Sequence, residues 1–169
     1  MSKELRLNQG VMIKAVEEKS PTVLIIKGIA SMYRTPEGFL QVDRDYESVN
    51  LDFMELDSYK KNPVLVFQHD WQRPMGKITE IEIRDGSMFI TAEVHKLTGE
   101  ENIFEAVQNG IVKSLSIGFI PKEFSYVPSG VGEDILQVSR AELVEISLTT
   151  VQSNQEALFS VIAEKSVGV

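Results

Sequence analysis

The stretch Lys77-Ile-Thr-Glu-Ile-Glu-Ile-Arg-Asp-Gly-Ser-Met-Phe-Ile-Thr-Ala-Glu-Val94 contains two alternating runs separated by Asp85-Gly86. Asp-Gly is a strong signal for a two-residue turn between antiparallel strands, because both turn positions need positive φ. In the second run, alternate positions carry apolar residues that share one face of a strand: Met88, Ile90, Ala92 and Val94. The stretch predicts a β-hairpin with one buried face.

Further segments of strand length and strand composition lie on both sides of this hairpin. They are residues 11–16, 22–31, 64–67, 112–119, 135–138 and 140–150. Residues 34–50 read as a loop. Together these segments predict an α+β fold, with a mainly antiparallel, barrel-like sheet and peripheral helices.

Three segments carry helix signals. Residues 55–61 form a short candidate that Asn62-Pro63 stops. Thr98-Gly-Glu-Glu101 reads as a capping box, opening a helix with Ile103, Ala106 and Val107 on its apolar side. Ser153-Asn-Gln-Glu156 reads as the cap of a closing helix, whose face would be Ala157, Leu158, Val161 and Ile162. The predicted organisation is a flexible start (1–10), one domain (11–163) and a flexible tail (164–169).

Composition excludes several classes of protein. The 169 residues include no cysteine, which rules out thiol proteases, thiolate zinc sites and disulfide scaffolds. The net charge of −8, from 17 basic and 25 acidic residues, argues against nucleic acid or an anionic membrane surface as partner. No apolar run has the length of a membrane span, and the first residues lack the apolar core of a signal peptide. Other proteins are the expected partners.

The chain has two histidines, and one of them is a candidate general base. His69 follows the apolar run 64–67 and precedes Asp70 and Trp71. Histidine titrates closest to neutral pH, so His69 suits proton transfer, although a half-buried histidine bonded to a carbonyl is the simpler interpretation. His95 reads as a solvated surface residue. No spacing resembles a metal motif, so no metal or other cofactor is expected.

The segment 113–119 places polar residues on one face of an otherwise apolar strand. Ser114, Ser116 and Gly118 point one way, and Leu115, Ile117 and Phe119 the other. A solvated outer face would explain the serines. Gly118 weakens a strand unless another backbone approaches closely, and a substrate main chain beside Ser116 would be such a backbone.

Two carboxylates lie on the run 140–150. Glu142 and Glu145 are three residues apart, so a regular strand would place them on opposite faces. Either could be a solvated surface group, and a buried one could orient an imidazole.

Three segments, in this order, resemble the prohead proteases of tailed phages, which are related to the herpesvirus assemblins. They are Pro63-Val-Leu-Val-Phe-Gln-His-Asp70, Gly110-Ile-Val-Lys-Ser-Leu-Ser-Ile-Gly-Phe119 and Glu142-Leu-Val-Glu-Ile-Ser-Leu-Thr-Thr150. The resemblance covers roughly residues 24–160 and implies an assemblin-like barrel. It also implies Ser116 as nucleophile, His69 as base and Glu145 as third triad member, with Glu142 as the alternative and Gly118 against substrate.

The resemblance further implies a serine endopeptidase of the host cytoplasm, enclosed in the immature capsid. Its substrates would be the major capsid protein, the scaffold segment of that protein, and the protease itself, with the tail 164–169 as a candidate cleavage segment. Two departures are the altered Gln41-Val-Asp-Arg-Asp45 and the Gln152-Ser-Asn154 that replaces Pro-Ala-Asn. The arginines that assemblins use near the oxyanion have no counterpart here. A non-enzymatic capsid or scaffold component and a generic protein-binding module remain open, as does a homo-oligomer.

Overall fold

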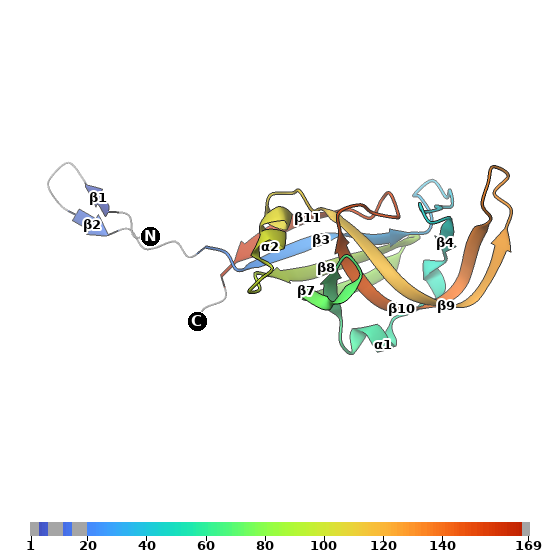
Figure 1. Ribbon diagram of the computed structural model, residues 1–169, viewed down its shortest axis with the longest axis horizontal. Coiled ribbons are helices and arrows are strands. Elements are labelled where there is room, and N and C mark those ends of the chain that lie inside the picture. The colour runs from blue at the N-terminus through green and yellow to red at the C-terminus, as the bar shows by residue number, and fades with distance from the viewer. Residues whose placement is uncertain (1–3, 7–11, 15–19, 167–169) are drawn as a thin grey trace.

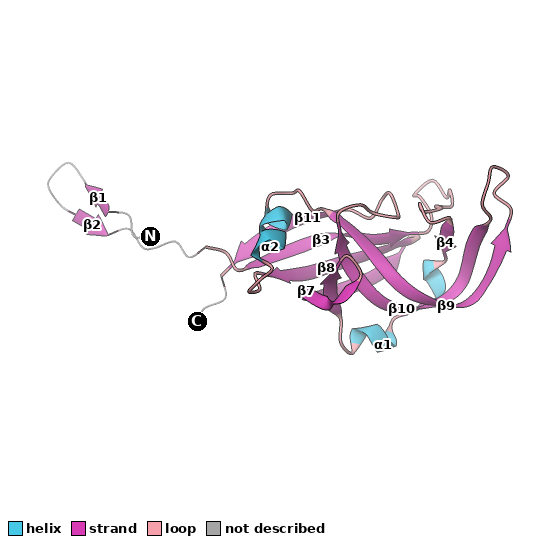
Figure 2. Ribbon diagram, viewed as in Figure 1, coloured by secondary structure: helices cyan, strands magenta, loops and turns pink. Residues whose placement is uncertain are grey.

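The computed structural model describes residues 4–6, 12–14 and 20–166 (Figure 1). Strands dominate this part of the chain (Figure 2). They are β1 (Glu4–Arg6), β2 (Met12–Lys14), β3 (Val23–Met32), β4 (Glu47–Val49), β5 (Met54–Glu55), β6 (Val64–Phe67), β7 (Asp70–Arg84), β8 (Ser87–His95), β9 (Ser114–Val127), β10 (Ile135–Thr149) and β11 (Phe159–Lys165). The helices are the 3-10 helix η1 (Leu51–Phe53), α1 (Asp57–Lys60) and α2 (Glu101–Gln108). None of these helices could cross a membrane.

Nine strands form one sheet in the order β11-β3-β8-β7-β6-β10-β4, and β5 and β9 also pair with β10. Five of the pairs are antiparallel, which confirms the mainly antiparallel sheet that the sequence predicts. In contrast, β4, β5 and β6 run parallel to β10. The parallel pairing brings the ends of β6 and β10 to the same edge of the sheet.

The start of β9 closes the sheet into a barrel-like ring. Leu115 N donates to Ala157 O at 2.8 Å, and Phe159 N donates to Lys113 O at 3.0 Å, so β9 joins the residues that lead into β11. Beyond this junction, residues 116–121 of β9 do not pair with β3 in the described part of the chain, so the ring stays open there. A pocket lies at that opening.

The core confirms the alternation predicted for the hairpin. Each of the four residues predicted to share a face of β8 is at most 1% exposed. The largest fully buried side chains are Leu24, Ile26, Leu51, Leu65, Met75, Met88, Ile90, Phe104, Leu115, Leu143, Ile146 and Leu148. Burial of each such side chain stabilises the fold by about 1.5–3 kcal/mol.

The predicted closing helix is wrong, because the segment forms strand β11 against β3. Ala157 and Phe159 are buried and Val161 packs on the core, which is the two-residue period of a strand. Leu158 and Ile162, which the helix would have buried, are 41% and 57% exposed.

Several predicted boundaries also differ. Helix α2 starts at Glu101 with Glu100 as N-cap and no side-chain cap, so the predicted capping box does not form. The two predicted strands 135–138 and 140–150 are one strand, β10, and β9 runs on to Val127. β1 lies in the segment predicted to be flexible, and β11 ends at Lys165, inside the predicted tail. Residues 167–169 lie outside the described residues.

Candidate active site

His69 lies on the two-residue turn between β6 and β7. Phe67 pairs with Asp70, and Gln68 and His69 between them have φ values of 53° and 57°. These are left-handed conformations, as in the type I′ turns that usually contain Asn or Gly. Residues with a Cβ atom cost about 1–2 kcal/mol each in this region. The turn therefore needs support from the rest of the fold.

The carboxyl end of β10 supports this turn. Gln68 N donates to Leu148 O at 2.8 Å, and its side-chain amide donates to Thr150 Oγ1 (3.2 Å) and accepts from Thr150 N (3.1 Å). His69 N donates to Ser147 Oγ at 3.1 Å. These bonds hold the imidazole against β10.

Glu145 of β10 is the carboxylate that meets this imidazole. Its side chain is buried, its Oε1 contacts Nδ1 of His69, and the same oxygen accepts a 3.1 Å hydrogen bond from Ser147 Oγ. Its Oε2 accepts a hydrogen bond from the indole N–H of Trp71. Because a carboxylate only accepts, the proton on Nδ1 faces Glu145 and Nε2 of His69 is left as the acceptor.

Two residues near Glu145 were not predicted to belong to the site. Trp71, at the start of β7, was noted only as a neighbour of His69, and 70% of it is exposed. Tyr59 of α1 is buried and donates its hydroxyl to Val64 O at 2.8 Å. Burial raises the pKa of Tyr59, and the charge of Glu145 raises that pKa further. A neutral phenol therefore lies behind the carboxylate.

A β-bulge at Val144 sets the direction of Glu145. The pairing of β10 with β9 shifts between Leu143 and Glu145. Leu143 before the bulge and Ile146 after it both belong to the core, so Glu142 and Glu145 both point away from the core. The expectation that the two glutamates lie on opposite faces is therefore wrong.

Glu142 nevertheless lies apart from His69. Its carboxylate is 3.5 Å from Lys122 Nζ, and it pairs in register with Glu55 of β5. Glu55 contacts the same lysine at 3.2 Å. Of the two candidate glutamates, the structure brings only Glu145 to the imidazole.

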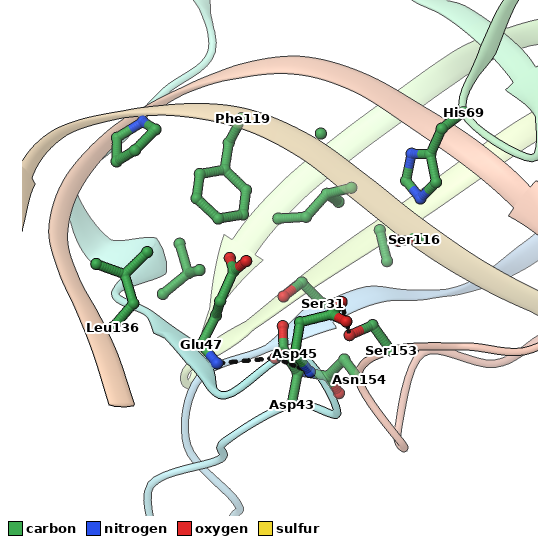
Figure 3. Close-up of a pocket in the computed structure, with 15 residues that line it drawn as sticks. Ser31, Asp43, Asp45, Glu47, His69, Ser116, Phe119, Leu136, Ser153 and Asn154 are labelled. Carbon is green, nitrogen blue, oxygen red and sulfur yellow. Dashed lines mark hydrogen bonds between the residues drawn. The ribbon is translucent and has the colours of Figure 1, made fainter. Parts of the chain in front are cut away.

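Ser116 lies beside this group on β9. It pairs in register with Ser147, whose hydroxyl lies 3.1 Å from Glu145 and 3.4 Å from His69 Nδ1. Among the described residues, the Ser116 hydroxyl makes no hydrogen bond. Ser116 and His69 line the same pocket and lie close together in Figure 3.

Gly118 pairs in register with Glu145. A Cβ atom at position 118 would lie 2.9 Å from Cδ of Glu145 and would overlap its Cγ. The glycine therefore makes room for the Glu145 side chain, while its expected contact with a substrate backbone stays a prediction. Gly118 also lines the pocket, next to Ser116.

The pocket has a volume of about 310 Å³. Apart from Ser116, His69 and Gly118, it is lined by Ala30, Ser31, Asp43, Asp45, Glu47, Val49, Ile117, Phe119, Pro121, Leu136, Ser153 and Asn154. Three of these residues are acidic and come from the segment read as a loop. In the sequence, Asp43 and Asp45 stood out only as part of the segment 41–45 that departs from the resembled family, and Glu47 did not stand out at all.

The second histidine belongs elsewhere. His95 Nε2 lies 2.8 Å from Glu93 Oε2 in a hydrogen bond, and its side chain is about one-third exposed, so it is more buried than predicted. In the part of the chain that the structure describes, no three metal-ligating side chains converge.

Comparison with known proteins places the chain in a family. The model of the caudovirus prohead serine proteases matches residues 10–167. The chain belongs to the caudovirus prohead serine protease family. The prohead protease of Escherichia phage T5 is 31% identical to this chain over 105 residues, which cover 62% of this chain and 48% of the T5 protein. A capsid polyprotein of Pseudomonas phage PAJU2 is 26% identical over 99 residues, 54% of this chain and 14% of the polyprotein. The chain thus matches about half or less of these relatives.

Two solved structures resemble this prohead protease family member. The capsid assembly protease of bacteriophage T4 superposes with a TM-score of 0.54 and 12% identity, over 87% of this chain and 90% of the T4 chain. The KSHV protease bound to a hexapeptide phosphonate inhibitor gives a TM-score of 0.48 and 13% identity, over 81% of this chain and 64% of that chain. The first of these likenesses shows a shared fold.

Proposed function

We propose that this family member is a serine endopeptidase with Ser116 as nucleophile, His69 as general base and Glu145 as the third member of the triad. The observation that supports this proposal is the contact of Glu145 with Nδ1 of His69, while Ser116 pairs with Ser147 beside both groups. The position of Glu142 next to Lys122 argues against it as the third member.

In this mechanism, Nε2 of His69 takes the proton of Ser116 Oγ as the oxygen attacks a peptide carbonyl carbon. The imidazolium then gives the proton to the leaving amine, and water hydrolyses the acyl-enzyme with the same base. Glu145 holds the imidazole tautomer and stabilises its charged form. Each donor of an oxyanion hole would contribute roughly 3 kcal/mol.

We further propose that the substrates are the major capsid protein, its scaffold segment and the protease itself, inside the immature capsid. The supporting observations are the family and the relatives, since one relative is named a prohead protease and another a capsid polyprotein. The opening beside β9 is where an extended peptide would lie, with its main chain next to Gly118.

A fluorophosphonate probe tests the nucleophile without any knowledge of the substrate. It phosphonylates an activated serine hydroxyl, so mass spectrometry should find the adduct on Ser116. Incubation with a scaffold-bearing capsid protein and identification of the fragments then tests the substrate. Ser116→Ala should stay folded and lose both reactions, the second by on the order of a millionfold.

Ser114→Ala is the matched control. Ser114 lies two residues away on the same strand, and its hydroxyl donates to Thr149 O at 2.7 Å inside the sheet. It should keep both reactions. If Ser114→Ala abolishes them and Ser116→Ala does not, the nucleophile is misassigned. Absence of adduct and fragments in the wild type would favour a non-enzymatic capsid component.

A further inference from the structure

The wall of the pocket away from Ser116 and His69 carries the carboxylates of Asp43, Asp45 and Glu47 (Figure 3). No lysine or arginine lines the pocket. None of the three carboxylates forms an ion pair with a described residue. The wall is thus a concentration of negative charge that the described part of the chain does not neutralise.

The three carboxylates have few hydrogen-bond donors. Asp43 accepts from the backbone N–H groups of Asp45 and Glu47, both at 2.9 Å, and Asp45 accepts from Ser153 Oγ at 2.7 Å. The carboxylate of Glu47 has no hydrogen-bond partner among the described residues. Burial raises the pKa of Asp43 and of Glu47, and the neighbouring Asp43 and Asp45 raise that of Glu47 further. Like charges brought together and partly desolvated gain from a cation.

A second observation in the same pocket, the hydroxyl of the buried residue Ser31, independently indicates a ligand. Ser31, near the end of β3, is 6% exposed and lines the pocket. Its hydroxyl has no hydrogen-bond partner in the described part of the chain. The free hydroxyl of Ser31 therefore offers an acceptor to a donor group that enters the pocket.

The remaining lining selects the kind of cation. Besides the polar Ser153 and Asn154, the pocket has an apolar part, formed by Ala30, Val49, Ile117, Phe119, Pro121 and Leu136. Lysine and arginine match this mixture, since they combine an apolar stem with a cationic head. A metal ion matches it less well, because no three metal-ligating side chains converge among the described residues.

We propose that this pocket binds a lysine or arginine side chain of the substrate peptide, close to the bond that Ser116 cleaves. The proposal rests on the proposed protease function, since Ser116 and His69 line the same pocket. It makes the enzyme selective for basic cleavage segments.

Cleavage of a randomised peptide library by the full chain tests the proposal. Mass spectrometry of the new termini should show lysine or arginine enriched at least tenfold at one position relative to the scissile bond. For matched peptides with lysine or norleucine at that position, kcat/KM should favour lysine by a similar factor. The ratio of kcat/KM for the lysine peptide to kcat/KM for the norleucine peptide should fall at least fivefold in Asp43→Asn and in Glu47→Gln. Glu105→Gln, which removes an exposed carboxylate from α2, should leave the ratio unchanged.

Binding to Ser116→Ala separates this proposal from the protease proposal. Fluorescence anisotropy should show the lysine peptide bound at least tenfold more tightly than the norleucine peptide, even if no cleavage occurs. Equal affinities would overturn the proposal, as would enrichment of acidic residues in the library. A lysine preference that survives in Asp43→Asn, in Glu47→Gln and in Ser31→Ala would also overturn it. If the wild type cleaves nothing while Ser116→Ala still prefers the lysine peptide, only the proposed protease function with Ser116 as nucleophile is overturned.

Discussion

Gly118 and Glu145 face each other across the β9–β10 pair, and the glycine leaves the space that the Glu145 side chain occupies. The carboxylate is held there from three sides, by His69, Ser147 and Trp71. It therefore cannot move aside without giving up at least one of these contacts.

Gly118→Ala should displace Glu145 and misplace the imidazole. A misplacement of about 1 Å can cost about 100-fold in rate, so we expect a loss of this order in kcat with a smaller change in KM. Steady-state kinetics on a peptide substrate measures both. Gly130→Ala is the control for a glycine substitution away from the pocket: a Cβ atom there meets nothing within 4 Å, and its φ of +81° should make the change cost stability and not kcat. Full activity in Gly118→Ala would show that the position of Glu145 does not matter.

Glu145→Gln should cost far more activity than Glu142→Gln. An amide at position 145 cannot accept from all the donors that contact Glu145, and it favours the wrong imidazole tautomer. Replacing the carboxylate of a serine-protease triad by an amide lowers kcat by about 10⁴-fold, and we expect a loss of this order. Glu142→Gln weakens a half-exposed contact with Lys122, worth less than about 1 kcal/mol. Single-turnover rates of the two variants decide the matter. The reverse order of effects would move the third triad member to position 142.

Trp71→Phe should lower kcat and leave the fold intact. The substitution keeps an aromatic ring but removes the N–H that Glu145 accepts, so the carboxylate loses one of its restraints. We expect a loss of about tenfold in kcat, with little change in the melting temperature because the side chain is mostly exposed.

A spectroscopic experiment checks the Trp71 contact without substrate. Trp71 is the single tryptophan of the chain, so its fluorescence reports this site alone. The emission spectrum should differ between wild type and Glu145→Gln and should not change in Glu142→Gln. An identical spectrum in all three proteins would argue against the contact.

Stability should depend on pH through Glu47. Burial raises the pKa of Glu47 above its ordinary value of 4.5, so the folded chain binds this proton more tightly than the unfolded chain. Its contribution is favourable at low pH and is lost as pH rises through the folded-state pKa. Glu47→Gln should therefore melt higher than wild type near neutral pH, and the advantage should shrink toward acidic pH. Thermal unfolding of both proteins from acidic to neutral pH tests this prediction. A difference in melting temperature that does not depend on pH would contradict it.

The hairpin and the segments that carry His69, Ser116 and Glu145 could be predicted because their signals are local. Asp85-Gly86 requires a tight turn whatever surrounds it, and alternation along Ser87–His95 requires a buried face. The three proposed triad positions follow from short motifs in a fixed order. That the three residues come together in space depends on how the whole sheet closes, which short motifs do not show.

The closing strand β11 could not be predicted, because the spacing of Ala157 and Val161 fits the period of a helix as well as that of a strand. Pairing with β3 decides between the two, and that pairing is not local. The bulge at Val144 depends likewise on the register of β9. It reverses the face of every later residue of β10, which a count along the sequence does not detect.

The acidic wall also escaped prediction. Asp43, Asp45 and Glu47 precede His69 and Ser116 in the chain without any motif that links them. They meet these residues only where the ring remains open beside β9.

The parallel pairing of β6 with β10 has a consequence for timing during synthesis. His69 and its carboxylate are 76 residues apart, so the imidazole gains its partner only after β10 has left the ribosome and docked. We expect a nascent chain that ends before β10 to be inert toward its neighbours, and a ribosome-stalled chain of that length should fail to react with a fluorophosphonate. The topology would then act as a delay, because the proposed triad could form only after β10 has been made.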